Sequence, residues 1–147
     1  MSARHVEVVC TGNICRSPIG EVVLRAKLAE AGIDDVVVTS SGTGGWHSGD
    51  PMDPRAAAAL ARHGYDGSAH RAQEFRSYWF GERDLVLAMD SGHLSTLVRL
   101  AGAEGAVPID LFAETDVPDP YYGDDTNFDE VLTQIEKAAD LWITRLR

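Results

Sequence analysis

Apolar and polar residues alternate along the chain in short blocks, each with the length of a strand or a helix. Four short apolar runs, bounded by polar or glycine residues, predict β-strands. These predicted strands cover residues 5–10, 36–38, 85–89 and 107–109. Between and after them, apolar residues recur every three or four positions, which predicts four amphipathic helices. The predicted helices begin at Ser17, at Asp53, at Asp90 or Ser91, and near Asn127.

Two of these helix starts have the same chemical signature. Ser17 and Asp53 each precede a proline, so a side-chain oxygen can cap the helix while the proline occupies its first position. The last helix carries a continuous apolar stripe that predicts packing against the body of the fold. The stripe consists of Phe128, Val131, Leu132, Ile135, Ala139, Trp142 and Leu146.

The order of these elements predicts the fold class. Strand and helix alternate, which favours an α/β fold with a four-stranded parallel sheet between two helical layers and right-handed crossovers. We expect one domain over residues 1–147, a three-layer α/β/α sandwich. Two long loops, 40–51 and 110–125, interrupt the pattern. In such a fold the ligand site lies at the carboxyl ends of the strands.

Composition narrows the function classes. Hydrophobic residues make up 44% and charged residues 24% of the 147 residues, as in ordinary globular proteins. The formal net charge of −10 opposes broad contact with nucleic acid or an anionic membrane. No apolar run is long enough to span a membrane, and the first residues lack the apolar core of a signal peptide, so we expect a cytoplasmic protein. Two cysteines near the N-terminus do not form a disulfide framework, and reduced thiols invite reactive roles.

The run from Cys10 to Pro18, CTGNICRSP, lies where the first strand passes into the first helix. Backbone N–H groups converge on an anion at such a junction, so we expect a phosphate-binding loop there. Gly12 permits a tight turn, and the guanidinium of Arg16 can hold two phosphate oxygens. The same positive field favours the thiolate of Cys10, which can attack phosphorus and form a phosphocysteine. Arginine and the loop amides can stabilise this transfer, so no metal or other cofactor is expected.

A proton for the leaving group is still needed. Asp119, in the loop sequence DPYYG, is the candidate general acid and the base that later activates water. Pro120 restricts the backbone of Asp119 and helps to hold its carboxyl group in place.

Both motifs, CTGNICRSP and DPYYG, resemble those of the bacterial low-molecular-weight protein tyrosine phosphatases, and the similarity extends over nearly the whole chain. The resemblance implies Cys10 as nucleophile, Arg16 as phosphate clamp and Asp119 as acid and base. It also implies a hydroxyl at Ser17 that steadies the thiolate. The other phosphate-loop members are then Thr11, Gly12, Asn13, Ile14 and Cys15. The substrates would be phosphotyrosine-containing proteins. The protein itself would be a monomer.

The same resemblance assigns weaker roles to residues around the loop. Asn13, Ser40 and His70 would form a hydrogen-bonded support, although Gln73 stands where many relatives have arginine. Cys15 would pair with Cys10 under oxidation and protect it. The walls of the cleft that receives an aromatic ring would be Trp46, Tyr121 and Tyr122.

Several other interpretations remain open. Cys10 could be a buried structural cysteine, and the histidines and the tyrosine pair could be ordinary surface or packing residues. Asp90 is interpreted as a helix cap rather than a site residue. A zinc site does not fit the cysteine spacing. Rival functions are an arsenate reductase, disfavoured because no cysteine follows Cys15, and a phosphoarginine phosphatase, disfavoured by Ile14 and the tyrosine pair. A phosphate sensor or phosphocysteine carrier is disfavoured by the presence of both Arg16 and Asp119.

Overall fold

Four parallel strands form the sheet of this computed structural model, which describes residues 3–102 and 107–147. The strand order is β2-β1-β3-β4. The strands are β1 (Arg4–Cys10), β2 (Val36–Gly42), β3 (Leu85–Ala88) and β4 (Ile109–Leu111). The helices are α1 (Arg16–Glu30), α2 (Pro54–Arg62), α3 (Ser91–Ala101) and α4 (Asp125–Leu146), with a short 3-10 helix, η1 (Ser77–Gly81).

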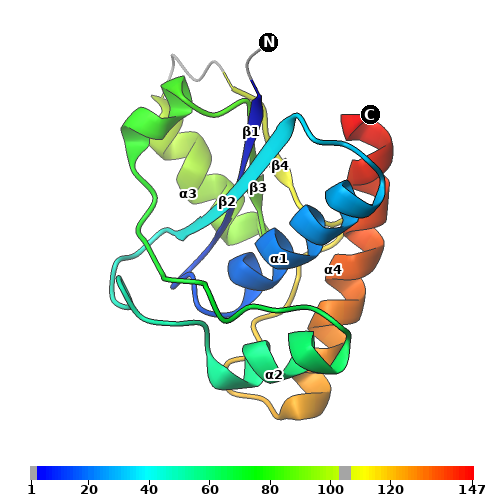
Figure 1. Ribbon diagram of the computed structural model, residues 1–147. Helices are drawn as coiled ribbons and strands as arrows, with labels where there is room; N and C mark the ends of the chain where they lie inside the picture. The colour runs from blue at the N-terminus through cyan, green and yellow to red at the C-terminus, as the bar shows by residue number, and fades with distance from the viewer. Residues whose placement is uncertain (1–2, 103–106) are drawn as a thin grey trace.

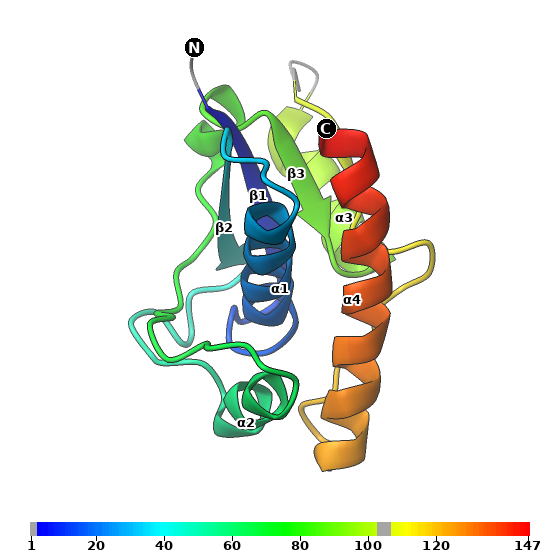
Figure 2. The same ribbon diagram turned by 45° about the vertical axis from the view of Figure 1, so that its right-hand side comes forward.

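Both faces of the sheet are covered, as Figures 1 and 2 show. Alternate residues of β1 point to opposite faces, because successive side chains of a strand do so. Val6 and Val8 therefore join one apolar cluster with α1 and α4, whereas Val9 joins a second cluster with Leu97 of α3 and with Trp79 and Phe80 of η1. The predicted three-layer α/β/α fold with a four-stranded parallel sheet is confirmed.

The carboxyl ends of β1 and β2 meet at one edge of the sheet. Cys10 at the end of β1 lies opposite Gly42 at the end of β2. The chain passes from Cys10 into α1, whose first turn lies at this same edge (Figure 1). The sheet topology therefore brings the predicted phosphate loop next to the loops that follow the neighbouring strands.

Several element boundaries differ from the predicted ones. The strand predicted for 36–38 extends to Gly42, because polar residues after Val38 continue to pair with β1. The fourth strand covers 109–111 rather than 107–109, and η1 was not predicted. The last helix begins at Asp125, where the side chain of Asp124 caps it.

The predicted helix caps are confirmed in two cases and wrong in one. The side chain of Asp53 accepts the backbone N–H of Arg55 at the start of α2, and Asp90 caps α3. Ser17 does not cap α1, because the helix begins at Arg16 and the cap position is Cys15, two residues before Ser17. The hydroxyl of Ser17 is instead buried inside the first turn.

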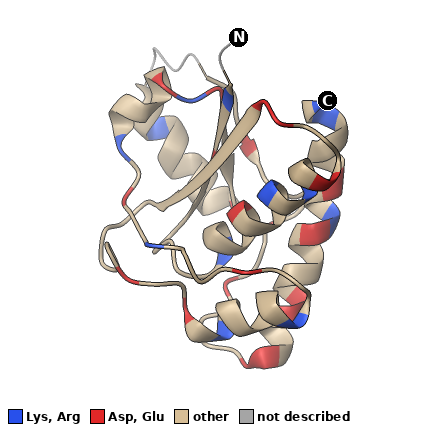
Figure 3. Ribbon diagram, viewed as in Figure 1, with Lys and Arg blue, Asp and Glu red and all other residues tan. Residues whose placement is uncertain are grey.

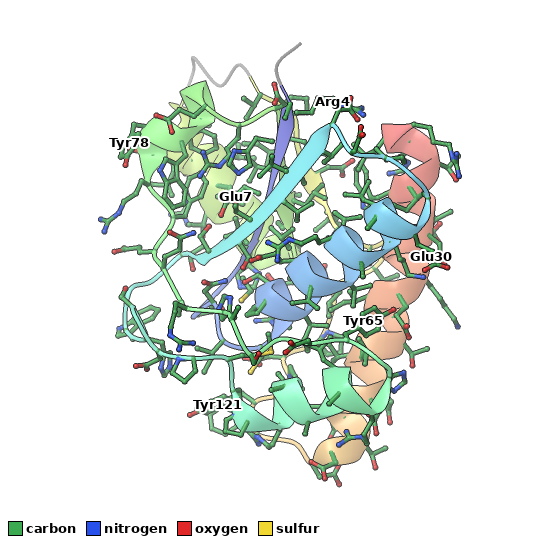
Figure 4. All side chains as sticks on the ribbon, viewed as in Figure 1. Arg4, Glu7, Glu30, Tyr65, Tyr78 and Tyr121 are labelled. Carbon is green, nitrogen blue, oxygen red and sulfur yellow. The ribbon has the colours of Figure 1, made fainter. Side chains whose placement is uncertain are left out.

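Charged residues lie mainly on the helices and loops, and β2 carries none (Figure 3). One exception is Glu7 of β1, labelled in Figure 4, whose fully buried carboxylate is 2.7 Å from Nε of Arg83. No helix within 3–102 and 107–147 combines the length and the apolar character needed to cross a membrane.

Candidate active site

The nucleophile candidate lies at the bottom of the phosphate loop. Cys10 is 3% exposed, and its Sγ lies 2.9 Å from Oγ of Ser17 in the first turn of α1. The side chains of Cys10 and Cys15 are both free thiols. Either group can be the donor in this contact, which joins the nucleophile candidate to the first turn of α1.

Asn13 forms the sharpest bend of the loop. Its φ of 59° lies in the left-handed region, which is strained for residues other than glycine. The fully buried amide is held by three hydrogen bonds. Its Nδ2 donates to Oγ of Ser17 at 2.8 Å and to Oγ of Ser40 at 3.0 Å, and its Oδ1 accepts the backbone N–H of Gln73 at 3.0 Å. These contacts stabilise a backbone conformation that the loop alone would not keep.

His70 and Gln73 complete the support behind the loop. Nε2 of His70 lies 2.7 Å from the carbonyl oxygen of Asn13, and the side-chain amide of Gln73 donates to the carbonyl of Ser40 at 3.0 Å. The structure thus brings together the three predicted support residues. Gln73, which stands where many relatives have arginine, takes part through its backbone N–H and its side chain.

The strand β2 approaches the loop so closely that only glycine fits at its end. A Cβ on Gly42 would lie 2.5 Å from the carbonyl oxygen of Thr11. Just beyond, the backbone N–H groups of Thr43 and Gly44 donate to the carbonyls of Cys10 and Thr11 at 2.8 and 3.0 Å. Because these carbonyls point away from the loop centre, its amides can converge on an anion, as in backbone nests.

Arg16 lies almost fully buried at the side of the loop, with 4% of the residue exposed. One terminal nitrogen, NH1, donates to Oδ2 of Asp90 at 2.8 Å and to the carbonyl of Val117 at 3.0 Å. The other, NH2, is 3.5 Å from Oγ1 of Thr11 and 3.7 Å from Oδ2 of Asp119. The guanidinium is therefore fixed in direction, which suits recognition of phosphate by two parallel hydrogen bonds.

A cleft of about 180 Å³ opens above the loop. Trp46 and Tyr122 at its rim are 77% and 94% exposed, and the ring of Tyr121, labelled in Figure 4, contacts that of Tyr122 edge-on at 5.0 Å. Asn13, Ser17, Ser40 and His70 are not in the lining; they lie behind the loop. The lining residues are Cys10, Thr11, Gly12, Ile14, Cys15, Arg16, Trp46, His47, Asp119, Tyr121 and Tyr122.

The two thiols have different surroundings. Burial raises the pKa of the Cys15 thiol far above its ordinary value, and the neighbouring carboxylate of Asp53 acts in the same direction. Cys15 is therefore protonated at neutral pH. Within the described residues, no group of three or more His, Cys, Asp or Glu is arranged to hold a metal ion.

Sequence reasoning missed several residues of the site. Asp90 was interpreted as a cap only, but it has two oxygens and performs two roles: Oδ1 accepts the N–H of His93 while Oδ2 binds Arg16. Its position directly after a strand that neighbours β1 was a usable signal. Gly42, His47 and His93 had no comparable signal, because only the tertiary fold brings them to the loop.

Comparison with known proteins agrees with this geometry. Residues 5–147 match the family described as "Low molecular weight phosphotyrosine protein phosphatase". A Streptomyces coelicolor protein named low molecular weight protein-tyrosine-phosphatase is 48% identical over 142 residues, 89% of this chain and 86% of that protein. These matches place the chain among the protein tyrosine phosphatases. Within that class it belongs to the low molecular weight phosphotyrosine protein phosphatase family.

Solved structures show the same fold. The crystal structure of a protein tyrosine phosphatase from Entamoeba histolytica has a TM-score of 0.94 at 28% identity, covering 98% of this chain and 97% of that one. A Drosophila arginine phosphatase also superposes, with a TM-score of 0.90 at 24% identity over 95% and 96% of the two chains. The fold is therefore shared by enzymes with different phosphorylated substrates, and the substrate must be argued from the site.

Proposed function

We propose that the protein hydrolyses phosphotyrosine in proteins through a phosphocysteine intermediate on Cys10. One observation carries the proposal: Cys10 and Arg16 of the phosphate loop and Asp119, more than 100 residues later in the sequence, line the same cleft. A thiol, a fixed guanidinium and a carboxyl group are the nucleophile, the charge stabiliser and the proton donor that this reaction needs.

In the first step, the thiolate of Cys10 attacks phosphorus and the bond from phosphorus to the tyrosine oxygen breaks. Arg16 and the loop amides stabilise the equatorial oxygens of the phosphoryl group. Asp119 donates a proton to the leaving phenolate oxygen. In the second step, Asp119 accepts a proton from water as that water attacks phosphorus, and the thiolate of Cys10 leaves, releasing inorganic phosphate.

The walls of the cleft support an aromatic substrate. Ile14 lines the bottom of the cleft, and Trp46, Tyr121 and Tyr122 stand around its mouth. Apolar and aromatic faces bury a phenyl ring more fully than the short side chain of phosphoserine, and the apolar side chain of Ile14 offers no hydrogen-bonding group to the guanidinium of phosphoarginine. This composition favours phosphotyrosine over the phosphoarginine alternative.

The test is a side-by-side turnover measurement on phosphotyrosine, phosphoserine and phosphoarginine peptides of one sequence, without added metal. We expect phosphotyrosine to give the highest kcat/KM, and Cys10→Ser to remove activity while thermal unfolding stays cooperative. Full activity of Cys10→Ser would exclude the mechanism, and a preference for the phosphoarginine peptide would replace the substrate.

We further propose that Cys15 protects the nucleophile under oxidation. Peroxide converts the Cys10 thiolate to a sulfenic acid, and the Cys15 thiol then displaces water to give a disulfide. Catalysis needs the reduced form, which fits a cytoplasmic enzyme. Peptide mass spectrometry after peroxide should find a linked Cys10–Cys15 pair that a thiol reductant reverses; sulfonic acid alone on Cys10 would contradict this role.

A further inference from the structure

His93 lies behind the phosphate loop, in the first turn of α3. The residue is 6% exposed, and its ring fits between the loop and the cap of its own helix. Nε2 lies 2.7 Å from Oγ1 of Thr11, which is 82 positions earlier in the sequence. Nδ1 lies 3.1 Å from Oδ1 of Asp90. Both residues that His93 contacts also direct a side-chain oxygen at a terminal nitrogen of Arg16, Asp90 at NH1 and Thr11 at NH2.

The protonation state of the ring follows from its surroundings. Burial and the positive charge of Arg16 lower the pKa of His93, and they outweigh the opposing effect of nearby carboxylates such as Asp90 and Asp119. A neutral ring carries one N–H. If that hydrogen were on Nε2, the lone pair of Nδ1 would face the Asp90 carboxylate at 3.1 Å, which is repulsive.

The favoured tautomer therefore has its hydrogen on Nδ1. Nδ1 makes no regular hydrogen bond to Asp90 in spite of the short distance, and it has no other hydrogen-bond partner among the described residues. The interaction is thus an electrostatic one. In this tautomer Nε2 is an acceptor, and Thr11 donates its hydroxyl hydrogen to it.

This direction of donation decides what Thr11 offers to Arg16. Once its hydrogen is committed to His93, the hydroxyl presents lone pairs toward NH2 of Arg16 at 3.5 Å. Asp90 already holds NH1 at 2.8 Å. The guanidinium is then oriented at both terminal nitrogens, by Asp90 and by Thr11.

We propose that His93 is a positioning residue for phosphate binding: through Thr11 it fixes an acceptor that, together with Asp90, orients the guanidinium of Arg16. The inference rests on the proposed function, since it assumes that Arg16 binds phosphate. The competing explanation is a histidine that only fills space in the core. That explanation requires no energetic link between His93 and the hydroxyl of Thr11.

The test is a double-mutant cycle on binding of inorganic phosphate, measured by titration calorimetry and as competitive inhibition of aryl phosphate hydrolysis. His93→Leu and Thr11→Val should each weaken phosphate binding about tenfold, the size expected for one oriented hydrogen bond. The double variant should bind no worse than either single variant, because both changes break the same link. Thr11→Ser, which keeps the hydroxyl, should bind phosphate more tightly than Thr11→Val and should still be weakened by His93→Leu.

Three results would overturn the inference. One is a double variant whose loss equals the product of the two single losses, and another is wild-type phosphate affinity in His93→Leu. The third is equal affinity of Thr11→Val and Thr11→Ser, which is decisive even if His93→Leu does not fold. Arg16→Ala distinguishes failure of the proposed function from failure of this inference. Unchanged phosphate binding in Arg16→Ala would refute the proposed function itself. Weaker binding in Arg16→Ala, without coupling between His93 and Thr11, would refute only the role of His93.

Discussion

The phosphate loop, residues 10–17, and the acid loop, residues 112–124, contribute to the same cleft but are held very differently. In the phosphate loop, Asn13 and Ser17 are fully buried and contact residues far away in the sequence. In the acid loop, the side chain of Asp119 is 49% exposed. Among the described residues, its carboxylate accepts a hydrogen bond from the backbone N–H of Tyr121, two positions away, at 3.1 Å.

The difference matches the two chemical tasks. Phosphate binding requires donors fixed before the substrate arrives, because charge stabilisation is strongest when no reorganisation is needed. Proton transfer requires a group that exchanges its proton with water in every cycle and reaches different leaving groups. A buried, braced loop suits the first task and a half-exposed carboxyl group suits the second.

The largest effect on activity is expected for a substitution in the phosphate loop. Arg16→Lys should lower kcat/KM on an aryl phosphate by about 10³-fold, because a lysine ammonium cannot reproduce the fork that Asp90 and Val117 orient. Steady-state kinetics would measure the loss. The matched control is Arg99→Lys on α3, an exposed arginine that donates to Thr96. A loss no greater than that of the control would mean that the orientation of the fork is unimportant.

A smaller and substrate-dependent effect is expected for the acid loop. Asp119→Asn should slow hydrolysis by about 10²-fold for leaving groups of high pKa and only slightly for those of low pKa, because only the former need a proton. A series of substituted aryl phosphates would give the slope of log kcat against leaving-group pKa. Asp125→Asn, at the exposed start of α4, serves as the control. An equal loss across the series would assign Asp119 to binding instead.

The third prediction concerns the support of the braced loop. Gly42→Ala should lower kcat/KM about tenfold and destabilise the fold by about 1 to 3 kcal/mol, because the new Cβ would overlap the carbonyl oxygen of Thr11. Gly81→Ala is the matched control, since a Cβ there meets no heavy atom within 4 Å. Thermal unfolding and kinetics should be measured together. A Gly42→Ala variant as stable and active as the control would show that the phosphate loop can shift to accommodate the new Cβ at little cost in free energy.

Local patterns predicted the fold and most of the cleft. The junction of strand and helix at Cys10 to Ser17 is a local feature, and so is the alternation of elements that placed it at the edge of a parallel sheet. The extension of β2 was missed because Thr39 and Ser40 are polar, although Ser40 is 2% exposed. The buried hydroxyl of Ser40 accepts a hydrogen bond from Asn13, so a residue type that is common in loops lies in a strand here.

The remaining errors have related causes. Ser17 has the signature of a helix cap, but its hydroxyl contacts Cys10 and Asn13, and the cap position is Cys15, two residues earlier. Contacts such as that of Thr11 with His93 join residues far apart in the sequence, where neither side chain carries a pattern that points to the other. Such contacts depend on tertiary packing, which a single sequence does not encode in its local periodicity.

The carbonyl of Val117, which binds Arg16, has a consequence for how this enzyme can change during evolution. Val117 is fully buried and lies two residues before Asp119, so the arginine proposed to bind phosphate also anchors the segment that carries the proposed acid. A substitution at Arg16 therefore changes the effect of substitutions in the segment from Val117 to Asp119, and the reverse also holds. Trp46 and Tyr122, exposed at the rim, are free of this constraint. Single substitutions at the rim can therefore change the substrate preference, whereas Arg16 and the segment that carries Asp119 must change together.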